Sequence, residues 1–215
     1  MTDLPLNIGR EPKVAALLLC AGASTRMGRA KPCLSFAGGT FLSHLARVFA
    51  QAGVDEIRVV AGGVHEAEVR AAAHALDVGA AIRVMRNLAP ADGPITSVRA
   101  ALASPGPTAD LYFIHPIDIP GVTLHDVRAL LECAAANATA SAVAPSIDGR
   151  RGHPLLLRGD FAARVLTLPP GATLRDLLKA PDVTVAYAEL ASPWLCRDVN
   201  TKEEYDALLA DWPRG

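Results

Sequence analysis

Residues 19–34 read Leu-Cys-Ala-Gly-Ala-Ser-Thr-Arg-Met-Gly-Arg-Ala-Lys-Pro-Cys-Leu, and the first two of them end the apolar run Val14–Cys20. The run is short, rich in aliphatic side chains and bounded by a proline and a glycine, which predicts a strand buried on both faces of a sheet. The next residues are small, so successive backbone N–H groups can approach an anion. Arg26 and Lys31 add positive charge. The stretch therefore predicts a phosphate-binding loop at the end of a strand.

Residue spacing excludes two common phosphate loops. A P-loop has four residues between its first glycine and Gly-Lys-Ser/Thr, whereas five residues separate Gly22 from Gly28, and Pro32 follows Lys31. The dinucleotide fingerprint Gly-x-Gly-x-x-Gly is also missing from this loop. Because Pro32 disfavours helical dihedrals at the preceding residue, we expect Lys31 on extended chain at the edge of the phosphate site.

The order of residues in this loop resembles a family signature. Small nucleotidyltransferases of the MobA-like, MocA-type family carry Leu-Ala-Ala-Gly-x-Ser-x-Arg-Met-Gly-x-x-Lys, and residues 19–31 match it with Cys20 in place of the first alanine. The resemblance implies that the loop wraps a nucleoside triphosphate, with Arg26 and Lys31 as catalytic cations. The nucleotide-binding residues that it implies here are Ala21, Gly22, Ala23 and Ser24. Ala21 stands where guanylyl-transferring relatives usually carry glycine, which favours CTP.

Composition limits the class of protein. The chain has 215 residues, 51% hydrophobic composition and a formal net charge of −1, which fits a globular domain with a sizeable core. A near-neutral chain is a poor candidate for nucleic-acid binding by phosphate neutralisation, and its apolar stretches are too short to suggest a membrane partner. The four cysteines show no zinc spacing. We expect reduced thiols and therefore a cytoplasmic location.

Apolar runs alternate with helical patterns along the chain, which predicts a mainly parallel sheet covered by helices. The resemblance implies a three-layer α/β/α, Rossmann-like nucleotidyltransferase fold. We expect residues 1–12 to form a flexible lead-in and residues 13–215 a single nucleotidyltransferase domain. Strands are expected at 14–20, 57–61, 82–85, 111–114, 141–144, 155–157 and 195–199, and helices at 41–52, at 66–76, after Thr123 and after Thr201. Ligands of open α/β sheets bind outside the carboxyl ends of the strands, so these ends define the candidate site.

Oxygen-bearing side chains follow two of the expected strands. Asp118 comes after residues 111–114, and Asp198 and Asn200 lie near the end of residues 195–199. Each residue could serve only as a turn or cap residue. The family, however, carries Asp-x-Pro at the first place and Asp-Ile-Asp-Thr-Pro-Glu-Asp at the second, so the resemblance implies Mg²⁺ bound by Asp118 with Asn200 or Asp198. Mg²⁺ commonly takes one or two protein oxygens and completes its shell with water and phosphate. Asn200 stands where the family usually has aspartate.

Residues 86–102 resemble the family segment in which Asn or Asp precedes a glycine-containing turn and a helix. The match implies that Asn87 contacts the nucleoside, while Gly93 and Ser97 line the base or the phosphates. We rank Asn87 above Ser97. The alternative is an ordinary helix N-terminus, for which Gly93 followed by proline is well suited.

Residues 149–154 read Gly-Arg-Arg-Gly-His-Pro. They resemble the Gly-Arg/Lys-Arg-Gly-His-Pro segment of cytidylyltransferases that act on molybdopterin, which implies that Arg151 and His153 bind the acceptor. A histidine before proline can also be structural, and that alternative stays open.

The resemblance implies a Mg²⁺-dependent transfer of a nucleoside monophosphate, CMP from CTP, to the phosphate of molybdopterin or the molybdenum cofactor, with release of pyrophosphate. A molybdoenzyme or its chaperone would be a protein partner. One alternative is transfer to a sugar phosphate or a polyol phosphate. A second is a nucleotide-binding cofactor chaperone without turnover, suggested by the neutral Asn200.

Overall fold

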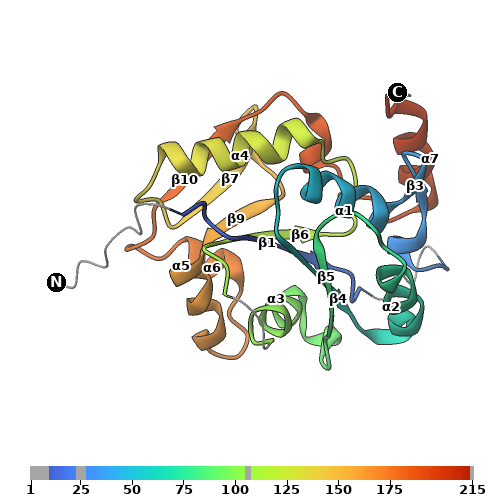
Figure 1. Cartoon of the computed structure of the whole chain (residues 1–215), viewed down its shortest axis with the longest axis horizontal. Coiled ribbons are helices and arrows are strands. Elements are labelled where there is room, and N and C mark those ends of the chain that lie inside the picture. Colours follow the sequence, from blue (N-terminus) through green and yellow to red (C-terminus); the bar gives the residue numbers. More distant parts are fainter. Residues whose placement is uncertain (1–9, 23–27, 105–107, 214–215) are drawn as a thin grey trace.

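A computed structural model describes residues 10–22, 28–104 and 108–213 of the chain. Within these residues an eight-stranded sheet lies between helices on its two faces (Figure 1). Its strands are β1 (Val14–Leu19), β4 (Glu56–Ala61), β5 (Ala81–Arg86), β6 (Leu111–Pro116), β7 (Ala142–Ile147), β8 (Arg150–Arg151), β9 (Leu155–Arg158) and β10 (Val185–Glu189). A separate hairpin joins β2 (Ser35–Phe36) to β3 (Gly39–Thr40).

The sheet is mixed but mostly parallel. The strand order is β10-β7-β9-β6-β1-β4-β5, with β8 paired to β7. Strand β1 is parallel to both β4 and β6, whereas β9 is antiparallel to β6 and to β7. The predicted α/β fold with a mainly parallel sheet is confirmed.

Seven α-helices cover the sheet in the described part of the chain, and five short 3-10 helices connect the elements. The α-helices are α1 (Phe41–Gln51), α2 (Glu66–His74), α3 (Pro94–Leu102), α4 (Leu124–Ala136), α5 (Gly159–Ala163), α6 (Leu174–Leu178) and α7 (Lys202–Asp211). The 3-10 helices are η1 (Lys31–Cys33), η2 (Gly63–His65), η3 (Pro90–Asp92), η4 (Arg164–Thr167) and η5 (Pro193–Cys196). Thr123 and Thr201 cap α4 and α7 in capping boxes, and both helices begin where the sequence predicts.

The hydrophobic core lies on both faces of β1. Ala16 and Leu18 face the cluster that contains residues of α1, α2, α4 and α7. Ala15 and Leu17 face the second cluster, with residues of α3, α5 and α6. Figure 1 shows α1 and α4 on one side of the sheet and α3, α5 and α6 on the other. The central strand is therefore buried on both faces, which explains its uninterrupted apolar sequence.

Two sequence predictions at the C-terminal part of the chain were inaccurate. The expected strand 195–199 is wrong, because η5 occupies Pro193–Cys196 and the backbone N–H of Val199 bonds to the turn after β6 instead of to a sheet strand. Strand β10 was not predicted. It is an edge strand in which only Ala188 is buried, so its sequence carries little hydrophobic signal.

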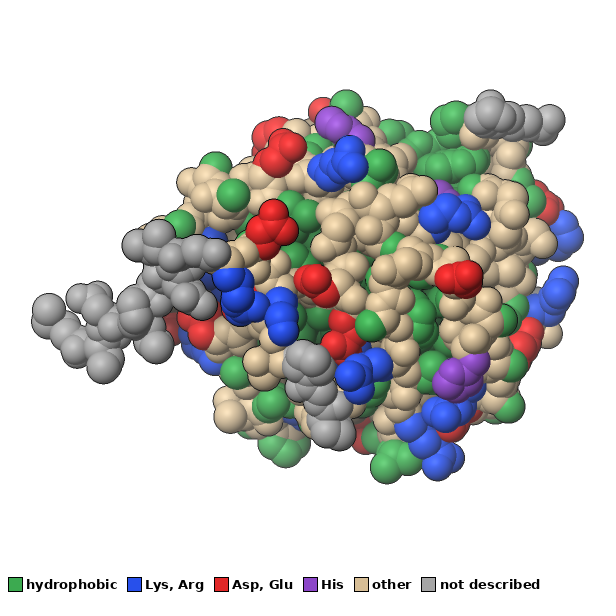
Figure 2. All heavy atoms as spheres, in the orientation of Figure 1, with side chains coloured by type: hydrophobic (Ala, Val, Ile, Leu, Met, Phe, Trp, Pro, Cys, Tyr) green, Lys and Arg blue, Asp and Glu red, His purple; other side chains and the backbone are tan. Residues whose placement is uncertain are grey.

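The predicted lead-in falls mostly outside the described residues, since residues 1–9 are not described. The division into residues 1–12 and 13–215 therefore stays a prediction. No helix in the described ranges is long and apolar enough to cross a membrane. On the face shown in Figure 2, acidic and basic side chains are interspersed, in keeping with the net charge of −1.

A buried ion pair links the sheet to α3. The Arg58 side chain is 2% exposed; its Nε donates to Glu56 Oε1 at 2.8 Å and its Nη1 donates to the Ala101 carbonyl oxygen at 2.8 Å. The guanidinium also lies 5.7 Å from the centroid of the Tyr112 ring. Glu56 accepts a second contact, at 3.1 Å, from Arg83, whose side chain is 43% exposed. Removing Arg58 would leave a buried carboxylate and a buried carbonyl without their main partner.

We predict that Arg58→Ala lowers the free energy of unfolding by about 3–5 kcal/mol, the usual cost of breaking a buried ion pair from one side. Arg83→Ala is the matched control, because it removes an exposed arginine from the same carboxylate and should cost under about 1 kcal/mol. Urea unfolding of the two variants measures the difference. Equal losses would show that the Arg58 pair does not hold β4 to α3.

His115 is a second buried polar group, on β6. The ring is fully buried, and Nε2 donates to the Ile119 carbonyl oxygen at 2.8 Å, since a carbonyl can only accept. Nδ1 is buried and has no hydrogen-bond partner among the described residues. Burial, helped by the nearby His153, lowers the pKa of His115 to about 3. The folded protein therefore keeps this imidazole neutral at pH values where an unfolded histidine is charged.

We predict that the free energy of unfolding decreases as the pH falls from 6.5 towards 3. In this range His115 binds a proton in the unfolded state but stays neutral in the folded state. The slope for this group approaches about 1.4 kcal/mol per pH unit. His115→Gln retains a donor for Ile119 and does not titrate, so its stability should depend less on pH over this range. Urea unfolding at several pH values compares the two proteins, and parallel pH profiles would contradict the assignment.

Candidate functional site

A cavity of about 370 Å³ lies at the carboxyl ends of β1 and β6. The chain runs from β1 to β4 and β5 on one side and then crosses to β6 on the other side of β1. In open α/β sheets such a switch point leaves a crevice in which ligands bind. The lining residues are Leu19, Cys20, Ala21, Gly22, Lys31, Pro90, Gly93, Pro94, Ser97, Pro116, Ile117, Asp118 and Asn200.

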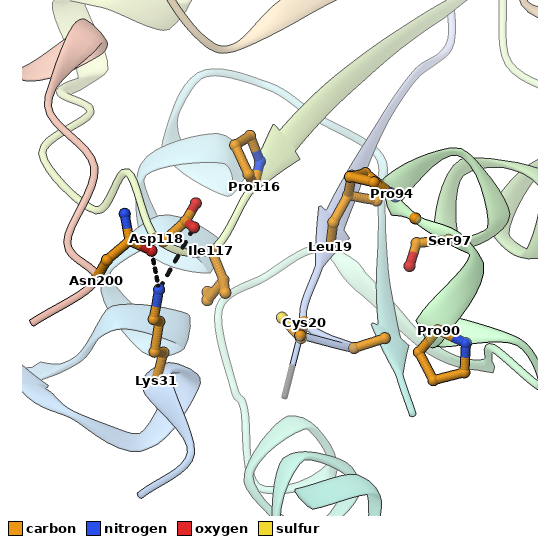
Figure 3. A pocket seen from close by; sticks show the side chains of 13 residues that line it. Leu19, Cys20, Lys31, Pro90, Pro94, Ser97, Pro116, Ile117, Asp118 and Asn200 are labelled. Atoms are coloured by element: carbon orange, nitrogen blue, oxygen red, sulfur yellow. Dashed lines mark hydrogen bonds and ion pairs between the residues drawn. The ribbon is translucent and has the colours of Figure 1, made fainter. Parts of the chain in front are cut away.

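The cavity has two chemically different sides (Figure 3). Lys31, Asp118 and Asn200 lie together on one side, where dashed lines mark their contacts. Pro90, Pro94 and Ser97 lie on the other, near the start of α3, and the end of β1 separates the two sides. One side is charged, and the other is mostly apolar with a single hydroxyl.

On the charged side, Lys31 meets two oxygen-bearing side chains. Its Nζ donates to Asn200 Oδ1 at 2.7 Å and lies 3.5 Å from Asp118 Oδ2. The expectation of extended chain at Lys31 is wrong, because Lys31 is the first residue of η1. Pro32 is compatible with that turn, since a first helical turn does not need the proline's missing N–H.

Hydrogen bonds fix the backbone at Asp118 and the side chain of Asn200. The Val199 N–H donates to the Asp118 carbonyl oxygen at 2.7 Å and joins the two segments. Asn200 Nδ2 donates to Asp198 Oδ2 at 2.6 Å, and the Asn200 backbone N–H donates to Glu204 Oε2 at 2.6 Å. With its amide nitrogen bonded to Asp198, Asn200 presents its oxygen to the cavity. Asp198 is exposed and acts through Asn200 in this arrangement.

The donor set suits a hard divalent cation. The described residues contain no group of three or more His, Cys, Asp or Glu side chains that could hold a metal. Asp118 and Asn200 nevertheless aim oxygens at one common point, which is now taken by the Lys31 ammonium. Two protein oxygens, completed by water and phosphate, form a usual Mg²⁺ environment.

Asn87 lies behind the apolar side of the cavity, where it bonds to Thr96 and to the lining residue Ser97. Its Nδ2 donates to Thr96 Oγ1 and Ser97 Oγ, both at 2.9 Å, and its Oδ1 accepts from the Ala89 N–H at 2.9 Å. The residue is 4% exposed and is not among the described residues that line the cavity. These bonds use both N–H groups of the amide and one acceptor site of its oxygen, so Asn87 positions the start of α3. Its predicted contact with a nucleoside stays a prediction, and the geometry favours Ser97 for direct contact.

Small residues let the loop after β1 pack against β4. A Cβ on Gly62 would lie 2.8 Å from the Asn87 carbonyl oxygen and 3.1 Å from the Ala21 Cβ, so only glycine fits there. Gly62 was not predicted from the sequence, because its importance depends on contacts with Ala21 after β1 and Asn87 after β5. Gly93 has φ of +96°, a left-handed value that favours glycine, at the start of α3. Of the predicted loop residues, Ala23, Ser24 and Arg26 lie outside the described residues.

The predicted acceptor residues, Arg151 and His153, are not among the described residues that line the cavity. Arg151 is exposed, with its guanidinium 4.9 Å from the centroid of the Tyr187 ring. The His153 backbone N–H donates to the Leu195 carbonyl oxygen at 2.9 Å, so the segment also joins β9 to η5. Burial lowers the pKa of His153, and the carboxylate of Asp118 acts in the opposite direction. Acceptor binding by Arg151 and His153 stays a prediction.

Cys20 is the thiol that lines the cavity among the described residues. It is 2% exposed, and burial raises the pKa of its thiol far above the ordinary value. Burial likewise raises the pKa of Cys33 to about 11. A protonated thiol is a poor nucleophile, so this site is unsuited to covalent catalysis by cysteine. All four cysteines are free, as expected.

Comparison with known proteins places the chain among nucleotidyltransferases. It is 28% identical over 202 residues to a protein of Bacillus cereus named as a probable molybdenum cofactor guanylyltransferase, covering 90% of this chain and 94% of the relative. It is also 28% identical over 218 residues to the nicotine blue oxidoreductase of Paenarthrobacter nicotinovorans, and this match covers 96% of this chain and 95% of the relative.

Among solved structures, Rv0371c of Mycobacterium tuberculosis H37Rv superimposes with a TM-score of 0.76 at 25% identity, covering 93% of this chain and 99% of the other. The same protein in complex with manganese gives a TM-score of 0.72 with the same coverage. Residues 16–186 match the family described as the MobA-like NTP transferase domain. This match spans β1 to β10 and includes Lys31 and Asp118. The chain therefore belongs to the family of MobA-like NTP transferase domains.

Proposed function

We propose that the cavity is the nucleotide site of a Mg²⁺-dependent nucleotidyltransferase, which transfers CMP from CTP to the phosphate of molybdopterin or the molybdenum cofactor and releases pyrophosphate. The observation that carries the proposal is the meeting of Lys31, Asp118 and Asn200 at the switch point of the sheet, in a chain of this family. The charged side would take the triphosphate, and the side with Ser97 and Gly93 the nucleoside.

The chemistry needs charge neutralisation more than a base. An oxygen of the acceptor phosphate monoester is already anionic and forms a bond to the α-phosphorus, while the bond to the bridging oxygen breaks and its electron pair leaves with pyrophosphate. The main barrier is repulsion between anions, which fixed cations reduce. Lys31, with Arg26 from the same loop, would neutralise the triphosphate and the leaving group. A bound divalent cation would neutralise phosphate charge and align the reactants.

Asp118 and Asn200 are the proposed protein ligands of this cation, with Asp198 supporting Asn200 from outside. The two inner residues present their oxygens to one point, and the Asn200–Asp198 hydrogen bond fixes the amide. The manganese complex of Rv0371c supports the use of a divalent metal at this fold. The preference for Mg²⁺ follows from the all-oxygen donor pair.

The choice of CTP rests on Ala21, which lines the cavity. Its methyl group lies close to Gly62, and Ala21 stands where the guanylyl-transferring relatives named in the resemblance usually carry glycine. We propose that the added methyl group leaves less room for a purine. The Bacillus cereus relative is named for guanylyl transfer, so GTP is the competing nucleotide. Molybdopterin as acceptor is supported by that same name and by the resemblance of residues 149–154. Another relative carries an oxidoreductase name, so family membership alone does not fix the reaction.

We predict release of pyrophosphate when the protein is given Mg²⁺, a molybdopterin acceptor and CTP, in a panel that also contains GTP, ATP and UTP. Lys31→Ala and Asp118→Asn should each lower kcat by about 10²–10³-fold, the usual loss when one preorganised charge contact is removed. Lys13→Ala, which removes an exposed lysine from the opposite end of β1, is the control and should leave the rate unchanged. A wild type that binds nucleotide without ever releasing pyrophosphate would favour the chaperone alternative. Transfer only to sugar or polyol phosphates would show that molybdopterin is not the acceptor.

Ala21→Gly should shift the ratio of kcat/KM for CTP over GTP towards GTP by about tenfold, because one methyl group in a pocket discriminates by roughly that factor. Ala37→Gly removes a methyl group in the exposed turn between β2 and β3, and should not alter the ratio. Steady-state kinetics with both nucleotides measures the shift. An unchanged ratio in Ala21→Gly would remove the physical basis for preferring CTP.

A further inference from the structure

The Lys31 ammonium takes the position at which the two proposed metal ligands converge. Its Nζ lies 2.7 Å from Asn200 Oδ1 and 3.5 Å from Asp118 Oδ2, and Figure 3 shows it between the two side chains. We propose that Lys31 is a resident cation that competes with the divalent metal, and that it must leave these oxygens before the metal can bind them. The inference rests on the proposed function, since it takes Asp118 and Asn200 as the metal ligands.

The Asn200 oxygen is held independently of Lys31, through its backbone N–H and its Nδ2. For Asp118 the backbone is fixed, because its carbonyl accepts from the Val199 N–H, and its carboxylate stays at the rim of the cavity. The Lys31 side chain is 11% exposed and that of Asp118 is 30% exposed, so water screens their contact only in part. The oxygen pair therefore persists when the ammonium departs, and it can receive another cation in the same place.

The lysine can move without its backbone. Its main chain is fixed in η1, where the Leu34 N–H donates to the Lys31 carbonyl oxygen at 3.1 Å and Pro32 is buried. Its four-carbon stem can swing by rotamer changes. Without nucleotide the ammonium satisfies the oxygens of Asp118 and Asn200. The phosphates of a bound triphosphate would offer it other anionic partners, so that nucleotide binding would free the metal position and couple the two ligands.

Charge explains why both cations cannot stay. Of Asp118 and Asn200, which both contact the ammonium, Asp118 supplies one negative charge and Asn200 supplies none. The carboxylates of Asp198 and Glu204 accept from the Nδ2 and the backbone N–H of Asn200. A divalent ion added beside Lys31 would leave an excess of positive charge at short range, which is unfavourable in a partly buried site. Because Asn200 is neutral, the two oxygens carry one negative charge between them, and exchange of one cation for the other becomes the favoured arrangement.

The test measures Mn²⁺ binding to the nucleotide-free full chain by electron paramagnetic resonance. In Lys31→Met the dissociation constant for Mn²⁺ should fall by about tenfold or more, the factor expected when a solvent-screened like charge is removed from the site. Lys31→Arg keeps the charge and should bind Mn²⁺ as weakly as wild type. Lys13→Met is the control for loss of one remote charge and should also match wild type. Circular dichroism and thermal unfolding verify that each variant is folded.

The double variant Lys31→Met, Asp118→Asn should lose the gained affinity, which locates the ion at Asp118. Equal Mn²⁺ affinity of wild type and Lys31→Met, or equal gains in Lys31→Met and Lys31→Arg, would overturn the inference. If the wild type still releases pyrophosphate in those cases, only the exchange fails and the proposed function stands. Absence of Mn²⁺ binding in both wild type and Lys31→Met would overturn the exchange together with the metal assignment.

Discussion

The hydrogen bond from the Val199 N–H to the Asp118 carbonyl oxygen, 2.7 Å long, is the contact on which the site depends. It joins the turn after the central strand β6 to the segment that leads into α7. Asp118 and Asn200 are far apart in the sequence, and this bond brings them to one side of the cavity. Together with the burial of Leu195 and Val199 in the core, it sets the two side-chain oxygens beside the lysine of η1.

Other parts of the fold shape the cavity at the same edge of the sheet. Burial of β1 on both faces fixes where its loop begins, and the crossing from β5 to β6 opens the crevice beside it. Gly62 allows the loop to approach β4, and the buried amide of Asn87 ties the turn after β5 to α3. The charged and the apolar sides of the cavity are thus built by different strand ends around one central strand.

Much of this could be predicted from the sequence because the signals are local or repeated. The apolar run of β1 reports burial on both faces, and the capping box at Thr201 marks the start of α7. The rule for strand ends, together with the family resemblance, selected Asp118 and Asn200, which do line the cavity.

The predictions that failed depended on contacts between distant segments. The segment after Trp194 is apolar, yet it bonds to the turn at Asp118 and to the Gly152–His153 segment instead of joining the sheet. The hydrogen bonds of Asn87 to Thr96 and Ser97 on α3 were not predicted either, and its expected contact with the nucleoside stays a prediction. The bond between Lys31 and Asn200 is equally invisible in the sequence, because the two residues lie near opposite ends of the chain.

The central claim is that Asp118 and Asn200 form one cation site at the carboxyl edge of the sheet. Anomalous diffraction from a crystal grown with Mn²⁺ and CTP tests it most directly. The account predicts a manganese peak within coordinating distance of both side-chain oxygens, with Lys31 turned towards the phosphates. A peak bound elsewhere on the protein, with Lys31 still bonded to Asn200, would contradict it.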